Sequence, residues 1–235
     1  IDFLTAEQKH RFFEDTYHSY GQPALMLSGG ATLGLFHVGV CKALHERNLL
    51  PKVISGSSAG SLVTGMLGTH NDEELVKMYD GEGFYHHAWT WKKMREGLLG
   101  QGFAEQKQLE HFVRNNIGEY TFEEAFAKTG RHINVTVSPV QAHKARLMNE
   151  LTSPYLLVWS AALASCAVPI LFPAVTLTAK NYQGEYHPYM PAKQWVDGSV
   201  RSDLPRQRLA RLFNVNYFIA SQVNPHIVPF MQTDK

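Results

Sequence analysis

The sequence predicts an α/β fold in which helices cover both faces of a central, mostly parallel sheet, a three-layer α/β/α arrangement. Two observations lead to this prediction. A short apolar run, a glycine turn and a helical pattern follow one another at residues 24–44, and the same order recurs at 52–67. Since adjacent parallel strands need a long return connection, two such units in succession indicate strands joined by helical crossovers.

The 235 residues, 1–235, are expected to form a single domain, because a chain of this length can bury one continuous core. Hydrophobic residues make up 44% of the sequence and charged residues 18%, a balance typical of folded globular proteins. The formal net charge of +1 provides no broad positive field, so nucleic acid is not an expected partner.

A leading helix is expected at residues 5–19, where aromatic residues recur at roughly helical spacing. Thr5 followed by Gln8 fits a capping box, and Gly21 ends the segment. The two strand-turn-helix units come next. Further strands are predicted from short apolar or β-branched runs at residues 132–137, 174–177 and 217–221.

The segment at residues 84–103 has a different character, because it mixes aromatic residues with His, Lys and Arg. This composition suits a mobile cover or a contact with a lipid interface, and it equally suits an ordinary helix packed through its aromatic side chains. The pair His86 and His87 lacks further ligands at metal-binding spacing, so no metal site is expected. Cys41 and Cys166 lie in apolar stretches, where free thiols behave as small hydrophobic residues, and no disulfide is expected.

Gly56, Ser58 and Gly60 form a Gly-x-Ser-x-Gly pattern between a β-branched run and a helical stretch. A nucleophilic serine in this setting sits at a sharp turn, and glycines two residues to either side let the backbone turn without a Cβ clash. The helix that follows directs its N-terminal dipole towards the site, which favours developing negative charge. Ser58 is therefore the predicted nucleophile.

A glycine-rich loop at residues 28–34 precedes the first helix of these units. An acyl-transfer enzyme needs backbone N–H groups aimed at the oxyanion of its tetrahedral intermediate, and a glycine loop at a helix N-terminus can supply them. The amides of Gly29, Gly30 and Ala31 are the predicted donors. A dinucleotide-binding loop is the competing interpretation, but the glycine spacing differs and no acidic residue closes the next strand.

Two residues compete as the base that activates Ser58. Asp197 follows a short apolar run and precedes Gly198, which places a carboxylate at a strand-end turn, where it would contact the serine directly as a dyad. In a Ser–Asp–His triad the base would instead be His226, the one histidine after residue 187. The residues alone leave both alternatives open.

Three motifs in this order resemble those of patatin-like phospholipases: the glycine loop that ends at Gly34, the elbow at residues 56–60, and Asp197-Gly198. The likeness is greatest to a subgroup that contains the secreted patatin domain of bacterial type Vd autotransporters (PlpD-like) and the triacylglycerol lipases of fungi and plants. Two departures stand out, since Ala31 and Leu33 occupy positions where patatins usually carry a third glycine and a basic residue.

The resemblance implies a patatin-like three-layer fold and a Ser58–Asp197 dyad that needs no histidine, metal or cofactor. The activity it implies is phospholipase A, of the A1 type, with lysophospholipase activity. The alternatives are a triacylglycerol lipase, a lysolipid transacylase with the same dyad, and a catalytically idle lipid-binding module.

The resemblance also implies partners and a location. The partners would be phospholipid and a membrane surface, with a homodimer as one oligomeric state. Secretion or the cell surface of a Gram-negative bacterium is the implied location, and an intracellular site at membranes or lipid droplets is the alternative.

Overall fold

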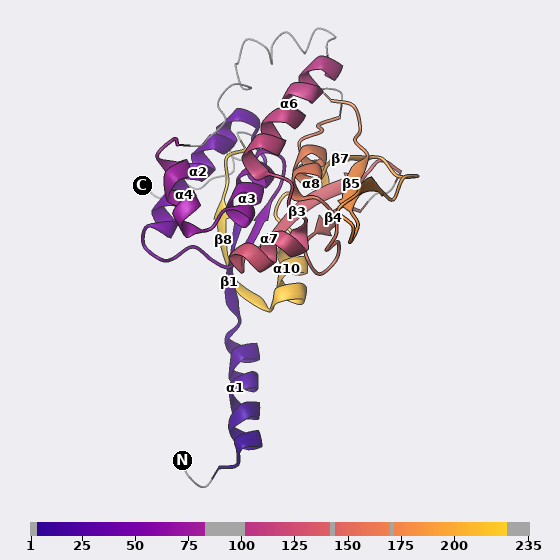
Figure 1. Ribbon diagram of the computed structural model, residues 1–235. Helices are drawn as coiled ribbons and strands as arrows, with labels where there is room; N and C mark the ends of the chain where they lie inside the picture. The colour runs from indigo at the N-terminus through magenta and orange to yellow at the C-terminus, as the bar shows by residue number, and fades with distance from the viewer. Residues whose placement is uncertain (1–3, 83–101, 142–143, 170–171, 225–235) are drawn as a thin grey trace.

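The computed structural model describes residues 4–82, 102–141, 144–169 and 172–224 (Figure 1). His226 and nearly all of the segment at residues 84–103 lie outside these ranges. The sequence-based interpretations of both therefore stay predictions.

The central sheet has the strand order β4-β3-β2-β1-β8, and β7 also pairs with β3. Its strands are β1 (Gln22–Leu27), β2 (Val53–Gly56), β3 (His132–Pro139), β4 (Arg146–Met148), β7 (Trp195–Asp197) and β8 (Val215–Ser221). The pairs β8-β1, β1-β2 and β2-β3 are parallel, whereas β4 and β7 run antiparallel to β3. The predicted mostly parallel sheet is confirmed.

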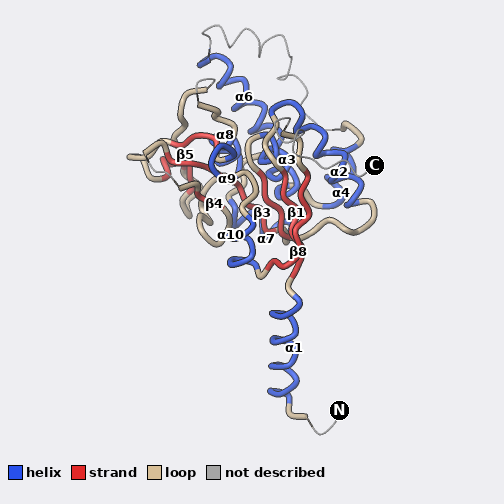
Figure 2. The backbone as a smooth tube through the Cα atoms, turned by 180° about the vertical axis from the view of Figure 1, so that it is seen from behind, coloured by secondary structure: helices blue, strands red, loops and turns tan. Residues whose placement is uncertain are grey.

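Helices lie on both sides of this sheet, as Figures 1 and 2 show from opposite directions. One face packs against α2 (Phe36–His45), α3 (Ala59–Thr69), α4 (Asp72–Tyr79), α6 (Gly102–Ile117), α7 (Phe122–Thr129) and α8 (Val158–Ser165). The other face packs against α10 (Arg206–Phe213). Two short helices, η1 (Ala31–Leu35) and α9 (Ser199–Ser202), follow β1 and β7.

Strand β1 shows why the sheet is buried on both sides. Leu25 and Leu27 belong to the larger core, while Ala24 and Met26 belong to the core beneath α10. Successive side chains of a strand point to opposite faces, so a continuous apolar run fits a strand covered on both faces.

A separate two-stranded hairpin joins β5 (Leu177–Lys180) to β6 (Tyr186–Tyr189). The strand predicted at residues 174–177 is wrong in position, because only Leu177 belongs to β5. The antiparallel pairing with β6 begins at Leu177, and the preceding Val175 forms only an isolated bridge with Trp195.

The leading helix is confirmed as α1 (Ala6–Tyr20), which projects from the body of the protein in both views (Figures 1 and 2). The capping box is present, because Gln8 N–H donates to Thr5 Oγ1 at 3.2 Å and Thr5 N–H donates to Gln8 Oε1 at 2.9 Å. No residue of α1 is buried.

Cys41 and Cys166 are both buried and free, in agreement with the sequence. None of the helices within the described ranges combines the length and apolar character of a membrane span.

Candidate active site

Ser58 lies in the turn between β2 and α3, as the N-cap residue of α3, with backbone angles of φ 48° and ψ −124°. A positive φ is strained for a residue other than glycine, and such strain is typical of a nucleophile elbow. The flanking glycines are required by close packing. A Cβ at Gly56 would lie 2.2 Å from the carbonyl oxygen of Gly60, and one at Gly60 would lie 2.3 Å from that of Leu27.

Buried hydrogen bonds hold the elbow on both sides of Ser58. Its backbone N–H donates to Ser165 Oγ at 2.9 Å, and Ser165 Oγ donates in turn to the carbonyl of Thr136 at 2.8 Å. The carbonyl of Ser58 accepts from Ser61 Oγ at 2.6 Å. The backbone around the serine is therefore fixed by contacts from α8 and α3.

Asp197 is the last residue of β7 and is almost completely buried. Its carboxylate accepts a hydrogen bond from the backbone N–H of Ser199 at 2.7 Å, and the hydroxyls of Ser58 and Ser199 lie near enough to lower the pKa of this carboxyl group. Its own N–H donates to the carbonyl of Ala167 at 2.9 Å. The structure thus places the two predicted dyad residues near each other.

Burial raises the pKa of Asp197 above its ordinary value of 3.8. Hydrogen bonds from Ser199 and Ser58 oppose this rise, and the nearby negative charge of Asp203 adds to it. A carboxylate with a raised pKa accepts a proton more readily than an ordinary one.

The glycine loop passes directly over the elbow. A Cβ at Gly29 would lie 3.3 Å from Ser58 Cβ and 3.2 Å from Ser199 Cβ. Gly30 has a φ of 158°, and Ala31 adopts the left-handed region with a φ of 49°. The loop therefore lies against the predicted nucleophile.

The three predicted oxyanion donors are not equivalent. The backbone N–H of Gly29 donates to Asp203 Oδ1 at 2.8 Å, so this amide already has a partner. Within the described residues, the N–H groups of Gly30 and Ala31 have no acceptor. As far as the described residues go, these two amides remain available to a ligand.

Asp203 contacts three separate segments around the site. Besides Gly29, its carboxylate accepts from Asn224 Nδ2 at 2.7 Å, and its backbone carbonyl accepts from Ser57 Oγ at 2.8 Å. Sequence reasoning missed Asp203, because a single aspartate before Leu204-Pro205 is typical of an ordinary turn.

His37 connects the start of the glycine loop to the end of β8. Its Nε2–H donates to the carbonyl of Ser28 at 2.9 Å, so its Nδ1 accepts from Ser221 Oγ at 2.7 Å. Burial lowers the pKa of His37 below its ordinary value of 6.5, which keeps the ring neutral. Ser28 Oγ also accepts from the N–H of Val223 at 2.9 Å. No local sequence pattern indicates this network.

The remaining motif glycines lie at close contacts between elements. Gly34 is buried in η1 against Ala59 of α3, and Gly198 follows β7 against the carbonyl of Thr136. No cluster of His, Cys, Asp and Glu able to hold a metal ion occurs among the residues that the structure describes.

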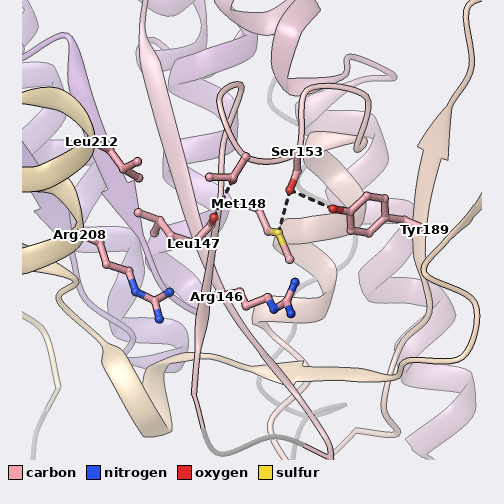
Figure 3. Close-up of a pocket in the computed structure, with 8 residues that line it drawn as sticks. Arg146, Leu147, Met148, Ser153, Tyr189, Arg208 and Leu212 are labelled. Carbon is pink, nitrogen blue, oxygen red and sulfur yellow. Dashed lines mark hydrogen bonds between the residues drawn. The ribbon is translucent and has the colours of Figure 1, made fainter.

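A cavity of about 240 Å³ lies apart from these residues, at the edge strand β4 (Figure 3). Its lining comes from β4, the loop that follows, β6 and α10, and includes Arg146, Ser153 and Arg208. Ser58, Asp197 and the glycine loop do not line it. The cavity is therefore not part of the candidate active site.

Residues 25–210 match the family described as "Patatin-like phospholipase". The chain is 42% identical to "Triacylglycerol lipase SDP1L" of Arabidopsis thaliana, over 97% of this chain and 31% of that protein. It is also 42% identical to "Triacylglycerol lipase 4" of Saccharomyces cerevisiae, over 93% of this chain and 26% of that protein. The chain thus spans about a third or less of the length of these relatives.

Among solved structures, VipD from Legionella pneumophila matches with a TM-score of 0.51 and 16% identity, over 85% of this chain and 49% of that one. This likeness concerns the fold alone. The relatives named above are plant and fungal proteins, so they give no support to the expected closeness to bacterial autotransporters or to secretion by a Gram-negative bacterium. The resemblance at the level of the family is confirmed, and this chain belongs to the patatin-like phospholipase family.

Proposed function

We propose that residues 1–235 form a single lipid acyl hydrolase domain in which Ser58 is the nucleophile and Asp197 is its base. The observation that supports this most strongly is the proximity of the Ser58 hydroxyl to the buried Asp197 carboxylate, at a strained turn between a strand and a helix. A serine hydroxyl is a weak nucleophile until a neighbouring base accepts its proton, and this contact supplies such a base without an imidazole.

In the first half of the proposed reaction, Asp197 accepts the proton of Ser58 Oγ while the oxygen attacks the acyl carbonyl carbon. The carbonyl oxygen gains negative charge, which the free amides of Gly30 and Ala31 and the N-terminus of α3 stabilise. The ester C–O bond then breaks, and the proton held by Asp197 passes to the leaving alcohol. An acyl-enzyme ester on Ser58 remains.

In the second half, water attacks the acyl-enzyme and Asp197 accepts a proton from that water. Collapse of the tetrahedral intermediate breaks the bond to Ser58 Oγ, which recovers its proton from Asp197. The products are a free fatty acid and the unmodified enzyme. Gly29 then serves to place the loop rather than to bind the oxyanion, because its amide is already bonded to Asp203.

Neutral acylglycerols are the substrate class that the loop favours. Leu33, at a position where patatins usually carry a basic residue, brings no positive charge for a phosphate. Leu35 and Phe36, which follow it, are 62% and 69% exposed and give the surface beside the loop an apolar character. The names of the plant and yeast relatives point in the same direction. Phospholipase A activity of the A1 type, with lysophospholipase activity, is the second candidate.

The test is fatty-acid release from a triacylglycerol emulsion and from mixed phospholipid vesicles. Wild type should act on the emulsion, and Ser58→Ala and Asp197→Asn should lose activity on both substrates while keeping their circular dichroism. Faster release from vesicles would replace the acylglycerol assignment by phospholipase A. A wild type inactive on both would contradict hydrolysis and favour a lipid-binding module.

Two further arms separate the remaining alternatives. Loss of activity in His226→Ala, with its fold intact, would replace the dyad by a triad. Transfer of the acyl chain to an added lysolipid, in preference to water, would identify a transacylase.

A further inference from the structure

We infer that Asp203 is a positioning residue that holds the oxyanion loop over Ser58 and places a negative charge near Asp197. The inference rests on the proposed function, because it assigns Asp203 a part in the same reaction. Asp203 belongs to none of the three sequence motifs that identify the site.

The first part of the inference comes from geometry. Asp203 bonds the glycine loop through Gly29, the elbow through Ser57 and the segment after β8 through Asn224, at 2.8, 2.8 and 2.7 Å. Gly29 in turn packs against Ser58, and the free amides of the loop follow it directly. The bond to Asp203 therefore fixes the position of the oxyanion donors relative to the nucleophile.

The second part concerns the charge of this side chain. A carboxylate near a site where an oxyanion forms is unfavourable for that oxyanion, so a neutral acceptor would hold Gly29 with less repulsion. An ionised acceptor has two compensating effects. It binds an amide N–H more strongly than a neutral one does, and its field favours the protonated form of Asp197.

Ser58, Ser199 and Cys166, which also lie near Asp197, add no negative charge to that of Asp203. Ser58 and Ser199 are neutral donors to its carboxylate. The thiol of Cys166 also lies near Asp197, and burial raises the pKa of that thiol, so it stays protonated at neutral pH. Within the described residues, Asp203 is therefore the charge that raises the pKa of Asp197, in addition to burial.

Two substitutions separate position from charge. Asp203→Asn keeps an oxygen acceptor for Gly29, and a flipped Asn224 amide can accept from the new NH₂ group. Asp203→Ala removes the acceptor as well. The matched control is Asp80→Asn, which makes the same chemical change in an exposed ion pair with Lys42.

The experiment measures kcat and KM for a soluble short-chain ester across pH. Asp203→Ala should lose kcat by on the order of 10- to 100-fold with little change in KM, since misplaced donors weaken transition-state binding. Asp203→Asn should keep most of kcat at neutral pH and move the acid limb of its pH profile to lower pH. Asp80→Asn should match wild type.

The inference is wrong if Asp203→Asn keeps the acid limb of wild type, or if Asp203→Ala keeps its kcat. Amide hydrogen exchange at Gly29 provides a readout that does not depend on turnover. Protection should be lost in Asp203→Ala and kept in Asp203→Asn, and equal protection in wild type and Asp203→Ala would overturn the loop contact. An inactive wild type, or an active Ser58→Ala, would instead contradict the proposed function and leave the exchange result to decide on Asp203.

Discussion

The backbone N–H of Ser58 donates a 2.9 Å hydrogen bond to the side chain of Ser165, which lies at the end of a different helix. The same hydroxyl donates to the carbonyl of Thr136 in β3. The side chain of Ser165 thus connects the strained turn at Ser58 to both α8 and the central sheet. This tie makes the elbow sensitive to a substitution far from it in sequence.

Ser165→Ala should reduce both stability and activity. It leaves the buried N–H of Ser58 without an acceptor, which costs about 1–3 kcal/mol of unfolding free energy. The matched control is Ser160→Ala in the same helix, where the lost hydroxyl accepts from the N–H of Thr178 at 2.8 Å. Urea unfolding should show comparable losses, while ester hydrolysis should fall only in Ser165→Ala. Equal kcat values in the two variants would contradict a role for Ser165 at the elbow.

Activity should decline as the pH falls through the raised pKa of Asp197. Only the ionised carboxylate can accept the proton of Ser58, so the acid limb of kcat/KM should have its midpoint above 3.8, the ordinary aspartate value. A profile measured with a soluble ester tests this. A midpoint at or below that value would contradict a buried Asp197 as the base.

Burial of Asp197 should make the folded protein less stable as the pH rises, although it is then that the base becomes active. A carboxyl group whose pKa is higher in the folded state binds its proton more tightly there, so ionisation lowers stability as the pH rises through that window. Asp197→Asn removes this cost and should melt at a higher temperature than wild type at neutral pH. The difference should shrink below pH 3.8, where the group is protonated in both states. A lower melting temperature at neutral pH would show that the lost hydrogen bonds outweigh the relief.

Gly60→Ala and Gly39→Ala should change stability in opposite directions. A Cβ at Gly60 would collide with the carbonyl of Leu27, which should cost about 1–3 kcal/mol or prevent folding. A Cβ at Gly39 in α2 meets no atom within 4 Å, so this change should add about 0.5–1 kcal/mol of helix stability. Chemical unfolding measures both values. Similar values for the two variants would contradict the close packing of the elbow.

Stability should also fall on acidification because of His37. Its pKa is lower in the folded state, so below its ordinary value of 6.5 the unfolded chain takes up a proton that the folded protein does not. His37→Gln should lose less unfolding free energy than wild type between pH 8 and about pH 5. His18→Gln on the exposed face of α1 serves as the control. An unchanged pH response in His37→Gln would contradict a neutral, buried His37.

The features that the sequence predicted well are local ones. Glycine turns between a short apolar run and a helical period identified β1, β2 and α3, and the Thr5 capping box identified the start of α1. Each depends on residues within a few positions of one another. The family resemblance added the order of the three motifs, which no single turn could supply.

The features that the sequence missed depend on residues distant along the chain. Strand β4 has only three residues and forms because it pairs antiparallel with β3. Ser165, Asp203 and His37 gain their roles from contacts with other elements, and none has a pattern of neighbours that distinguishes it from an ordinary core or turn residue. The displaced strand at residues 174–177 has the same origin, because the hairpin partner decides where the ladder begins.

Helix α1 receives few stabilising contacts from the other residues that the structure describes. Phe12 and Phe13 are 64% and 67% exposed, and the contacts with the body lie at its last residues, where Asn214 Nδ2 donates to the carbonyl of Tyr17 at 3.1 Å. A 15-residue helix without tertiary packing is marginal in water. The chain therefore contains two units that can melt separately: a cooperative core that carries Ser58 and Asp197, and a helix that can unwind without disturbing them.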